Sequence, residues 1–437
     1  MPLSWERGPR FVLTETIRVS TNILNEVCEG TNLDRALDPY RKSSNAPLIF
    51  ELCYGTLRHW YSLKEHIDML LVKSLKKQNN DIHCLLLIGA YQLHNTKIPA
   101  YAVVSESVIA ARNLGKEWAT GLVNAVLKKA IRQIKPKSAE AQYETPDWLL
   151  RAWKSHYPEE WVQIAEASNR KAPMTLRANI SKISRNELIT QLKLAGILAK
   201  PGSSPTSIVL SKAQPSTSIP GFKSGLFSVQ DEASQWAAEL LAPSIEAQTL
   251  DACAAPGIKS AQILERNPNQ KLTSIDIAAY DRSYASHEGR RLGINSQILP
   301  GDATKLDWWN GESYDSILLD APCSGTGTIR RNPDIKLHQN EENIGRIVEL
   351  QLSLLTNLWK TLSRNGSLLY CTCSLLQEEN DLVMETFLAT NKEAQINALD
   401  TNENFSLVSR KLKYGYQTLP NDNGPDGFYF ASLSKRK

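Results

Sequence analysis

Two cysteines lie at the end of one apolar stretch, and a third follows another. The stretch GSLLYCTCSLLQEEN contains Cys371 and Cys373, and SILLDAPCSGTG contains Asp320 and Cys323. A thiolate is a strong nucleophile that forms a covalent bond readily and also leaves readily. A carboxyl group beside it can hold or supply a proton. The pattern indicates covalent catalysis, in which either Cys323 or Cys373 could be the nucleophile.

The remaining cysteines give no sign of a disulfide framework or a metal site. The seven cysteines are odd in number and mostly lie in apolar stretches. There is no C-x-x-C motif, and Cys371 and Cys373 have no nearby histidine, so we expect no metal. No stretch approaches the roughly 20 apolar residues of a membrane span, and no secretory signal is visible. We therefore expect a cytoplasmic protein with no membrane association and no obligate protein partner.

The charge is unevenly distributed along the 437 residues. The whole chain has a formal net charge of +4, but residues 1–200 hold 28 Lys and Arg against 19 Asp and Glu. The remainder holds 22 against 27, so the two parts carry +9 and −5. Such an imbalance favours a polyanion as partner of the first part, although a solvated lysine-rich surface would look the same.

The first 140 residues predict a bundle of helices. Apolar residues recur at helical spacing from Leu13 to Val27, and residues 81–95 are apolar almost throughout, as in a helix buried on several sides. Residues 101–115 and 118–134 complete the set. The last of these carries a cluster of basic residues that are candidates for binding RNA phosphates, Lys128, Lys129 and Arg132.

Two further regions follow a linker. Residues 145–225 predict a small, basic α/β unit that combines helices with two short strands. From residue 226 to 437, strands and helices alternate, which is typical of a doubly wound, mostly parallel sheet. The candidate strands are 248–252, 271–277, 296–302, 314–321 and 366–373, with 427–433 in a final hairpin.

The first of these strands leads into DACAAPGIKS, a turn of small residues before a helix. Such a turn brings backbone N–H groups close to a ligand. Carboxylates follow the next strands: Asp276 is placed to bind ribose hydroxyls, Asp302 to reach an adenine amino group, and Asp320 follows the fourth strand. Together with Asp251, they predict an adenosine-containing ligand, although any one of them could instead cap a helix.

The motifs DACAAPGIKS, DAPCSGTG and YCTCSLLQEEN, in this order, resemble those of the Sun-type RNA cytosine-C5 methyltransferases. With FSVQDEAS and GFYFASL, the similarity covers roughly residues 145–437. ELCYGTLRHW and GLVNAVLKKAI resemble the NusB-like RNA-binding fold. The combination is similar to bacterial enzymes that methylate a cytosine of 16S rRNA.

This resemblance implies a Rossmann-like domain that uses S-adenosylmethionine and no metal, after a NusB-like domain and a small RNA-binding unit. It implies Cys373 as the nucleophile, Cys323 as the group that assists product release, and Asp320 as the partner of cytosine N3. Arg330 and Arg331 follow the Cys323 motif in a predicted loop, where they could bind RNA phosphates or form a solvated pair. The implied cofactor-binding residues are Cys253, Ala254, Ala255, Pro256, Gly257, Ile258, Lys259, Asp276, Asp302 and Asp320.

One residue departs from the family motif, because Ile258 stands where the family usually has a second glycine. If that position needs a positive φ, isoleucine is strained and cofactor affinity falls. Cys371 is expected in the core, as are Cys28, Cys53 and Cys84.

Two other functions fit the same motifs. The chemistry could act on tRNA, or the chain could be a catalytically silent RNA-binding or ribosome-assembly protein. The presence of Cys323, Cys373 and Asp320 counts against the silent protein.

Overall fold

The computed structural model describes residues 9–280, 286–294, 298–399 and 403–436. The chain divides into two compact units. The first comprises residues 1–169 and 329–339, and the second comprises residues 170–328 and 340–437. Within the described ranges, no helix combines the length and hydropathy needed to cross a membrane.

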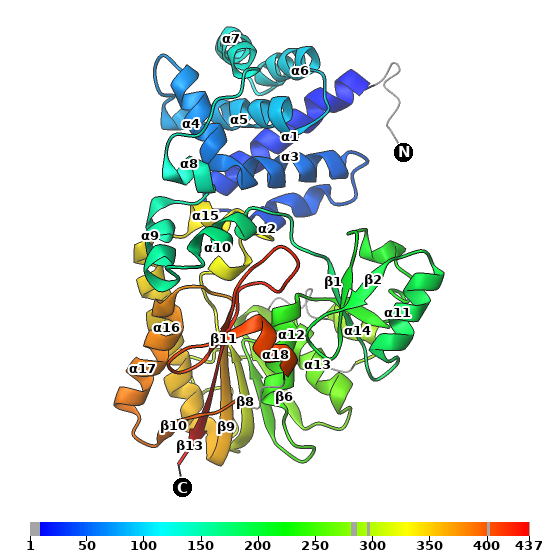
Figure 1. Cartoon of the computed structure of the whole chain (residues 1–437), viewed down its shortest axis with the longest axis vertical. Helices are drawn as coiled ribbons and strands as arrows, with labels where there is room; N and C mark the ends of the chain where they lie inside the picture. Colours follow the sequence, from blue (N-terminus) through cyan, green and yellow to red (C-terminus); the bar gives the residue numbers. More distant parts are fainter. Residues whose placement is uncertain (1–8, 281–285, 295–297, 400–402, 437) are drawn as a thin grey trace. The chain divides into compact units, whose positions relative to one another are not determined.

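A helical core forms most of the first unit (blue to cyan in Figure 1). Its helices are α1 (Pro9–Cys28), α2 (Leu33–Leu37), α3 (Ala46–Arg58), α4 (Trp60–Leu70), α5 (Asn80–Asn95), α6 (Ala100–Asn113) and α7 (Thr120–Ala130). Helix α5 is buried at nearly every position from Ile82 to Gln92, as its apolar sequence predicts. Gly55 on α3 leaves room for the Tyr91 ring, since a Cβ there would lie 2.0 Å from that ring. The two helices therefore pack closely.

Three shorter helices also belong to the first unit, namely α8 (Ala139–Tyr143), α9 (Asp147–His156) and α10 (Trp161–Ser168). The sequence analysis instead groups residues from 145 onwards with the strands that follow. In α9, Leu149, Leu150 and Trp153 are buried at helical spacing. This apolar face accounts for the strong helical pattern, but the sequence does not show which unit it packs against.

A segment from the far end of the sequence completes the first unit. Residues 329–339, with α15 (Ile335–His338), follow the Cys323 loop directly. Lys336 is 2% exposed, and its Nζ donates to Arg58 O at 3.0 Å, Glu144 O at 2.9 Å and Asn169 Oδ1 at 3.2 Å. All three protons of the ammonium group thus have acceptors, so this lysine holds the segment in place.

We expect Lys336→Met to lower the stability of the first unit by about 3 kcal/mol, because three buried acceptors lose their donor. Thermal unfolding measures this loss. Lys42→Met, at an exposed position, is the matched control and should change stability little. Equal unfolding temperatures for the two variants would contradict the role of Lys336.

The second unit begins with a four-stranded antiparallel sheet in the order β2-β3-β1-β4. The strands are β1 (Thr175–Ala178), β2 (Ala199–Pro201), β3 (Ser207–Leu210) and β4 (Phe227–Val229), with helix α11 (Arg185–Leu194). A capping box of Ser184 and Glu187 starts α11. Strand β4 lies just beyond the predicted boundary at residue 225, because it pairs with β1 rather than with the larger sheet.

Nine strands of the described chain form the larger sheet. β5 (Thr249–Ala252), β6 (Leu272–Asp276), β7 (Ile298–Pro300), β8 (Tyr314–Asp320) and β9 (Leu362–Thr372) run parallel in the order β9-β8-β5-β6-β7. β13 (Tyr429–Lys435) pairs antiparallel with β9 and with β10 (Ala394–Asn397), and β12 (Tyr416–Thr418) joins it to β11 (Ser409–Lys411). The predicted doubly wound, mostly parallel sheet is confirmed.

Alternation along the strands divides the larger sheet into two apolar faces. In β8, Ile317 and Leu319 belong to one cluster and Leu318 to the other. Figure 1 shows α16 and α17 on one side of these strands, and α12 and α13 on the other. Besides α11, the helices of this unit are α12 (Glu232–Leu241), α13 (Ile258–Arg266), α14 (Ser286–Leu292), α16 (Glu341–Thr361), α17 (Asp381–Thr390) and α18 (Glu403–Val408).

Arg177 of β1 ties the small sheet to α13. Its side chain is fully buried, forms two hydrogen bonds with Glu265 at 3.0 and 2.7 Å, and donates to Ile258 O at 2.8 Å. A bidentate guanidinium–carboxylate pair fixes distance and orientation together. The small sheet is thereby attached at the helix that follows the DACAAPG turn.

Candidate active site

The carboxyl ends of the parallel strands bring the predicted site residues together. β5 has β8 on one side and β6 on the other, so the chain leaves this point in both directions across the sheet. Such a switch point is where open α/β sheets bind ligands. β5 leads to Cys253, β6 ends at Asp276, β8 ends at Asp320 and β9 leads to Cys373.

The turn after β5 has the form that a nucleotide-type ligand needs. Gly257 has φ +92° and precedes α13, and a Cβ there would lie 3.2 Å from Ile298 Cδ1. Only glycine fits such a position without strain. Ile258 is the first residue of α13, in helical conformation, so the positive φ falls on the first glycine of the motif. The condition under which Ile258 would be strained is therefore not met.

Two of the carboxylates predicted to bind the cofactor also accept hydrogen bonds from the loops around them. Asp276 accepts from Ala255 N at 2.9 Å and from Ala278 N at 2.6 Å. Asp302 accepts from the Thr304 backbone and hydroxyl and pairs with Lys305. The Thr304 hydroxyl is the main reason that the pKa of Asp302 is lowered, so this group stays ionised. Both carboxylates remain partly exposed, which leaves them able to accept from a ligand.

Asp251 does not face the ligand crevice, contrary to the sequence analysis. It is fully buried and accepts from Ser260 Oγ, which in turn accepts from Ser274 Oγ. Asp251 therefore holds α13 against β5 beneath the turn. Burial is the main cause that raises the pKa of Asp251 to about 7. The hydrogen bond from Ser260 lowers this pKa, and the negative charge of Asp320 raises it.

This raised pKa predicts a pH-dependent stability. Between about pH 4 and 7, the folded chain keeps a proton on Asp251 that the unfolded chain has lost. The free energy of unfolding then falls as the pH rises, by roughly 1.4 kcal/mol per unit. We expect Asp251→Asn to remove this slope, as measured by urea unfolding at pH 5, 6 and 7. Parallel slopes for both proteins would show that Asp251 does not titrate in this range.

The two candidate catalytic cysteines lie in contact. Their Sγ atoms are 3.3 Å apart, and both side chains are partly exposed. The hydrogen bond to Cys373 and burial raise the pKa of Cys323 well above its usual range. Either thiol can donate to the other across this contact, and the Cys373 backbone N–H donates to Cys323 Sγ at 3.3 Å.

Asp320 is held beside the cysteines by two neighbours. It forms an ion pair with Lys259 of α13, and Cys371 Sγ donates to it at 3.5 Å. Burial disfavours the charged form of Lys259, but the charge of Asp320 outweighs it and raises the lysine pKa. Cys371 is fully buried, as predicted, although it also orients the carboxylate. Lys259 is thus a direct neighbour of Asp320.

A buried glutamate joins the loops of both cysteines. Glu379 is fully buried and accepts from Ser324 N at 2.7 Å, Ser324 Oγ at 2.5 Å and Ser374 Oγ at 2.5 Å. Ser324 follows Cys323, and Ser374 follows Cys373. Gly327 N also donates to Cys373 O at 2.9 Å. These contacts fix the separation of the two thiols.

Comparison with known proteins identifies the family. The model of the family described as 16S rRNA methyltransferase RsmB/F matches residues 238–434, a related ferredoxin-like domain matches 145–217, and the NusB family matches 15–132. The chain is 42% identical to the probable ribosomal RNA small subunit methyltransferase B of Coxiella burnetii over 96% of this chain and 99% of that protein. It is 39% identical to ribosomal RNA small subunit methyltransferase B of Shewanella oneidensis over 93% of this chain and 96% of that protein.

The chain belongs to the RsmB/F family of 16S rRNA methyltransferases. It is therefore an S-adenosylmethionine-dependent methyltransferase, and the resemblance drawn from its motifs is confirmed. The crystal structure of PH0851 is similar with a TM-score of 0.79, at 22% identity over 97% of this chain and 99% of that one. The crystal structure of NSun6 from Pyrococcus horikoshii with SFG is similar with a TM-score of 0.59, at 21% identity over 67% of this chain and 98% of that one. At these identities, the two structures support the fold.

The basic residues predicted to contact RNA have different environments in this RsmB/F chain. Lys128 and Lys129 on α7, and Arg132 after it, are exposed. Arg331 is partly exposed, but Arg330 is only 3% exposed, and its carbonyl accepts from Arg58. The predicted phosphate contact of Arg330 is corrected here, because a buried guanidinium cannot reach a phosphate.

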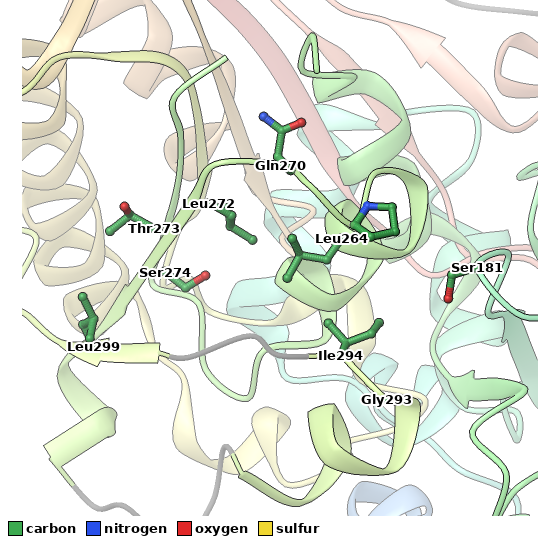
Figure 2. Close-up of a pocket in the computed structure, with 10 residues that line it drawn as sticks. Ser181, Leu264, Gln270, Leu272, Thr273, Ser274, Gly293, Ile294 and Leu299 are labelled. Carbon is green, nitrogen blue, oxygen red and sulfur yellow. The ribbon is translucent and has the colours of Figure 1, made fainter. Parts of the chain in front are cut away.

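A cavity of about 600 Å³ is lined by residues of α13 and β6 (Figure 2). It lies against β6, and its lining includes Leu264, Gln270 and Ser274 but no candidate catalytic residue. Gln270 donates to Ala247 O and Thr249 Oγ1, and Ser274 donates to Ser260. These polar groups serve the fold, so the cavity has no evident part in the chemistry.

Two residues that support the site were missed in the sequence analysis. Glu379 stands in the quoted motif as the second acidic residue of QEEN, but nothing in the sequence shows that it is buried. Arg177 stands in an ordinary β-strand, LRA, and gives no signal. Only the packing shows that each is fully buried with charged or polar partners.

Proposed function

We propose that this chain methylates carbon 5 of a specific cytosine in 16S rRNA, through a covalent bond between Cys373 and carbon 6. The observation that carries the proposal is the contact between Cys373 and Cys323 beside the Asp320–Lys259 pair. The names of the curated relatives support rRNA of the small subunit as substrate. Such a substrate would place the enzyme in the cytoplasm.

The residues after β5, β6 and β7 fit an adenosine-containing cofactor. Gly257 leaves the backbone open to it, and the partly exposed carboxylates of Asp276 and Asp302 would bind its ribose and base. The proposed binding residues are those of the sequence analysis, Cys253 to Lys259 with Asp276, Asp302 and Asp320. S-Adenosylmethionine supplies the methyl group when it is bound.

Cys373, Asp320 and Cys323 have separate proposed roles in the reaction of the cytosine ring. Attack of the Cys373 thiolate on carbon 6 forms an S–C bond and makes carbon 5 nucleophilic. Asp320, with Lys259 beside it, would hold the proton that N3 gains as charge builds on the ring. After methylation, carbon 5 loses its proton, the S–C bond breaks, and Cys323 assists this release.

The target cytosine has to be accessible from both sides. A base inside a duplex cannot meet the thiol and the methyl donor together, so it must be unpaired or flipped out. Lys128, Lys129, Arg132 and Arg331 are proposed to contact phosphates and set the register of the RNA.

The experiment is methyl transfer by the purified chain to unmodified 16S rRNA and, in parallel, to bulk tRNA. Mass spectrometry of the digested nucleosides identifies 5-methylcytidine. We expect it in 16S rRNA alone. Its appearance only in tRNA would overturn the proposed substrate, and its absence from both would favour a silent RNA-binding protein.

A further inference from the structure

A second polar cavity lies inside the first unit, remote in sequence from the cysteine motifs. It encloses about 310 Å³, and its walls come from α4, the end of α5, the segment after α7, and α8 with the residue that follows it. We call it the histidine pocket after His59, His66 and His94, which line it. Its volume is at the lower end of the range for small-ligand sites.

His66 lines this pocket and has a buried hydrogen-bonding group without a partner. The residue is 3% exposed, and its Nε2 has no hydrogen-bond partner among the described residues. Burial and the nearby His94 lower its pKa, so the ring is neutral and offers one donor and one acceptor. A buried polar atom without a partner is rare in native proteins and calls for a ligand or an ordered water.

The arrangement of the imidazoles suits a flat ligand better than a metal ion. The rings of His66 and His94 stack at 5.3 Å with 10° between their planes. The nitrogen lone pairs lie in these nearly parallel planes and do not converge on one point. His94 Nε2 is also engaged, since it donates to Ala130 O at 2.7 Å.

The charge of the wall argues against a phosphate inside the pocket. The Glu144 carboxylate accepts from Tyr61 N at 3.0 Å and Ser62 N at 3.2 Å, and lies 3.6 Å from His59 Nδ1. A phosphate would meet this carboxylate and the neutral imidazole of His66. The side-chain amides of Gln133 and Gln142, which also line the pocket, supply both donors and acceptors. A neutral group with a mixed polar edge fits such walls.

Positive charge lies beside the pocket instead. Gln133, Ile134 and Pro136 line it, and the exposed Lys135 and Lys137 alternate with them. The carboxylate of Glu65 fixes this segment to α4, because it accepts from the Lys137 and Ser138 backbone N–H groups at 2.7 and 2.9 Å. Lys128, Lys129 and Arg132 precede it as further exposed cations. An RNA backbone on these residues would have a base within reach of the pocket.

We infer that the histidine pocket binds one unstacked nucleobase of the RNA substrate, with the adjoining phosphates on the basic segment 128–137. This inference rests on the proposed function for its choice of RNA. None of the candidate catalytic residues lines the pocket, so the role inferred for it is to bind the substrate rather than to take part in the chemistry.

The test compares two pocket variants of the full chain with the unmutated protein. Gln142→Trp fills the pocket from an exposed position, and His66→Leu removes its buried polar group. Gln78→Trp, at an exposed position of the same unit outside the pocket, is the matched control. We expect the Kd for unmodified 16S rRNA to rise about tenfold in both pocket variants, the scale of one lost base contact. We also expect kcat at saturating rRNA and the unfolding temperature of Gln142→Trp to be unchanged.

Photocrosslinking gives a direct readout that a folding defect cannot mimic. In 16S rRNA containing 4-thiouridine, a single nucleotide should crosslink to the peptide spanning residues 133–144. An unchanged Kd in Gln142→Trp together with no crosslink would overturn the inference.

Two further results separate the alternatives. Titration with AMP, CMP, GMP and UMP tests whether the base comes from a free nucleotide. Tight mononucleotide binding that the variants abolish, with an unchanged Kd for rRNA, would overturn the RNA assignment. Methylation by the unmutated protein is measured separately, so its absence would refute the proposed function, whereas equal rRNA binding by pocket and control variants would refute the pocket.

Discussion

Cys373→Ala is expected to abolish methyl transfer to 16S rRNA, and Cys323→Ala is expected to accumulate a covalent protein–RNA adduct. Loss of the nucleophile removes the route through carbon 6, so kcat should fall by about 10⁴ or more. Loss of Cys323 leaves the Cys373 thiol in place but removes the neighbour whose Sγ lies 3.3 Å away. A denaturing gel of each variant with rRNA and S-adenosylmethionine resolves the adduct from free protein.

The control for this pair is Cys28→Ala, which should keep full activity and give no adduct. The expectation that Cys28 lies in the core is wrong, because this last residue of α1 is exposed. An adduct in Cys373→Ala but not in Cys323→Ala would exchange the two roles while keeping the chemistry. Full activity in Cys373→Ala would exclude a covalent mechanism through this residue.

Glu379→Ala is expected to cost about 3 kcal/mol of stability and to lower kcat about a hundredfold. The substitution leaves the Ser324 backbone N–H without its buried acceptor and releases the hydroxyls of Ser324 and Ser374. Since these serines follow the two cysteines, the two thiols lose their fixed separation. A small misplacement of reacting groups lowers the reaction rate strongly. Urea unfolding and single-turnover methylation measure the two effects.

The matched variant is Glu379→Gln, which keeps the shape and one acceptor oxygen. The serine hydroxyls can rotate to accept from its amide, so most of the activity should remain. Burial raises the pKa of Glu379 although its hydrogen bonds oppose this, so a neutral side chain suits the site. If Gln and Ala were equally inactive, the charge of Glu379 would act in the chemistry, and its positioning role would be wrong.

The sequence was sufficient for the parallel strands and for the residues at their ends. Strands buried on both faces appear as continuous apolar stretches, such as ILL in β8, which leave little doubt about the element. Because parallel strands place their carboxyl ends at one edge, Asp276, Asp320 and Cys373 were brought together by the topology alone. Helix α5 was predictable for the same reason, since it is apolar nearly all around.

The direction in which a polar side chain points was not predictable. Asp251 and Asp276 both stand near strand ends, but Asp251 points into the interior and Asp276 is partly exposed. Strand alternation separates the two faces of a sheet, but it does not say whether a loop or a helix covers the end. Arg330 was misjudged for a related reason, because the segment that carries it packs within the first unit.

By itself, the sequence determined the candidate catalytic thiols, the carboxylates and the succession of strands along the chain, because these depend on residue type and local hydrophobic pattern. The tertiary structure alone decided which charged groups are buried and with whom they pair, as for Glu379, Arg177 and Lys336. Arg177 and Lys336 each donate to a backbone carbonyl, 81 and 278 residues away, and Glu379 accepts from the backbone N–H of Ser324, 55 residues away. Such contacts leave no periodic signal in the chain, since burial of a charge is a property of the packed fold.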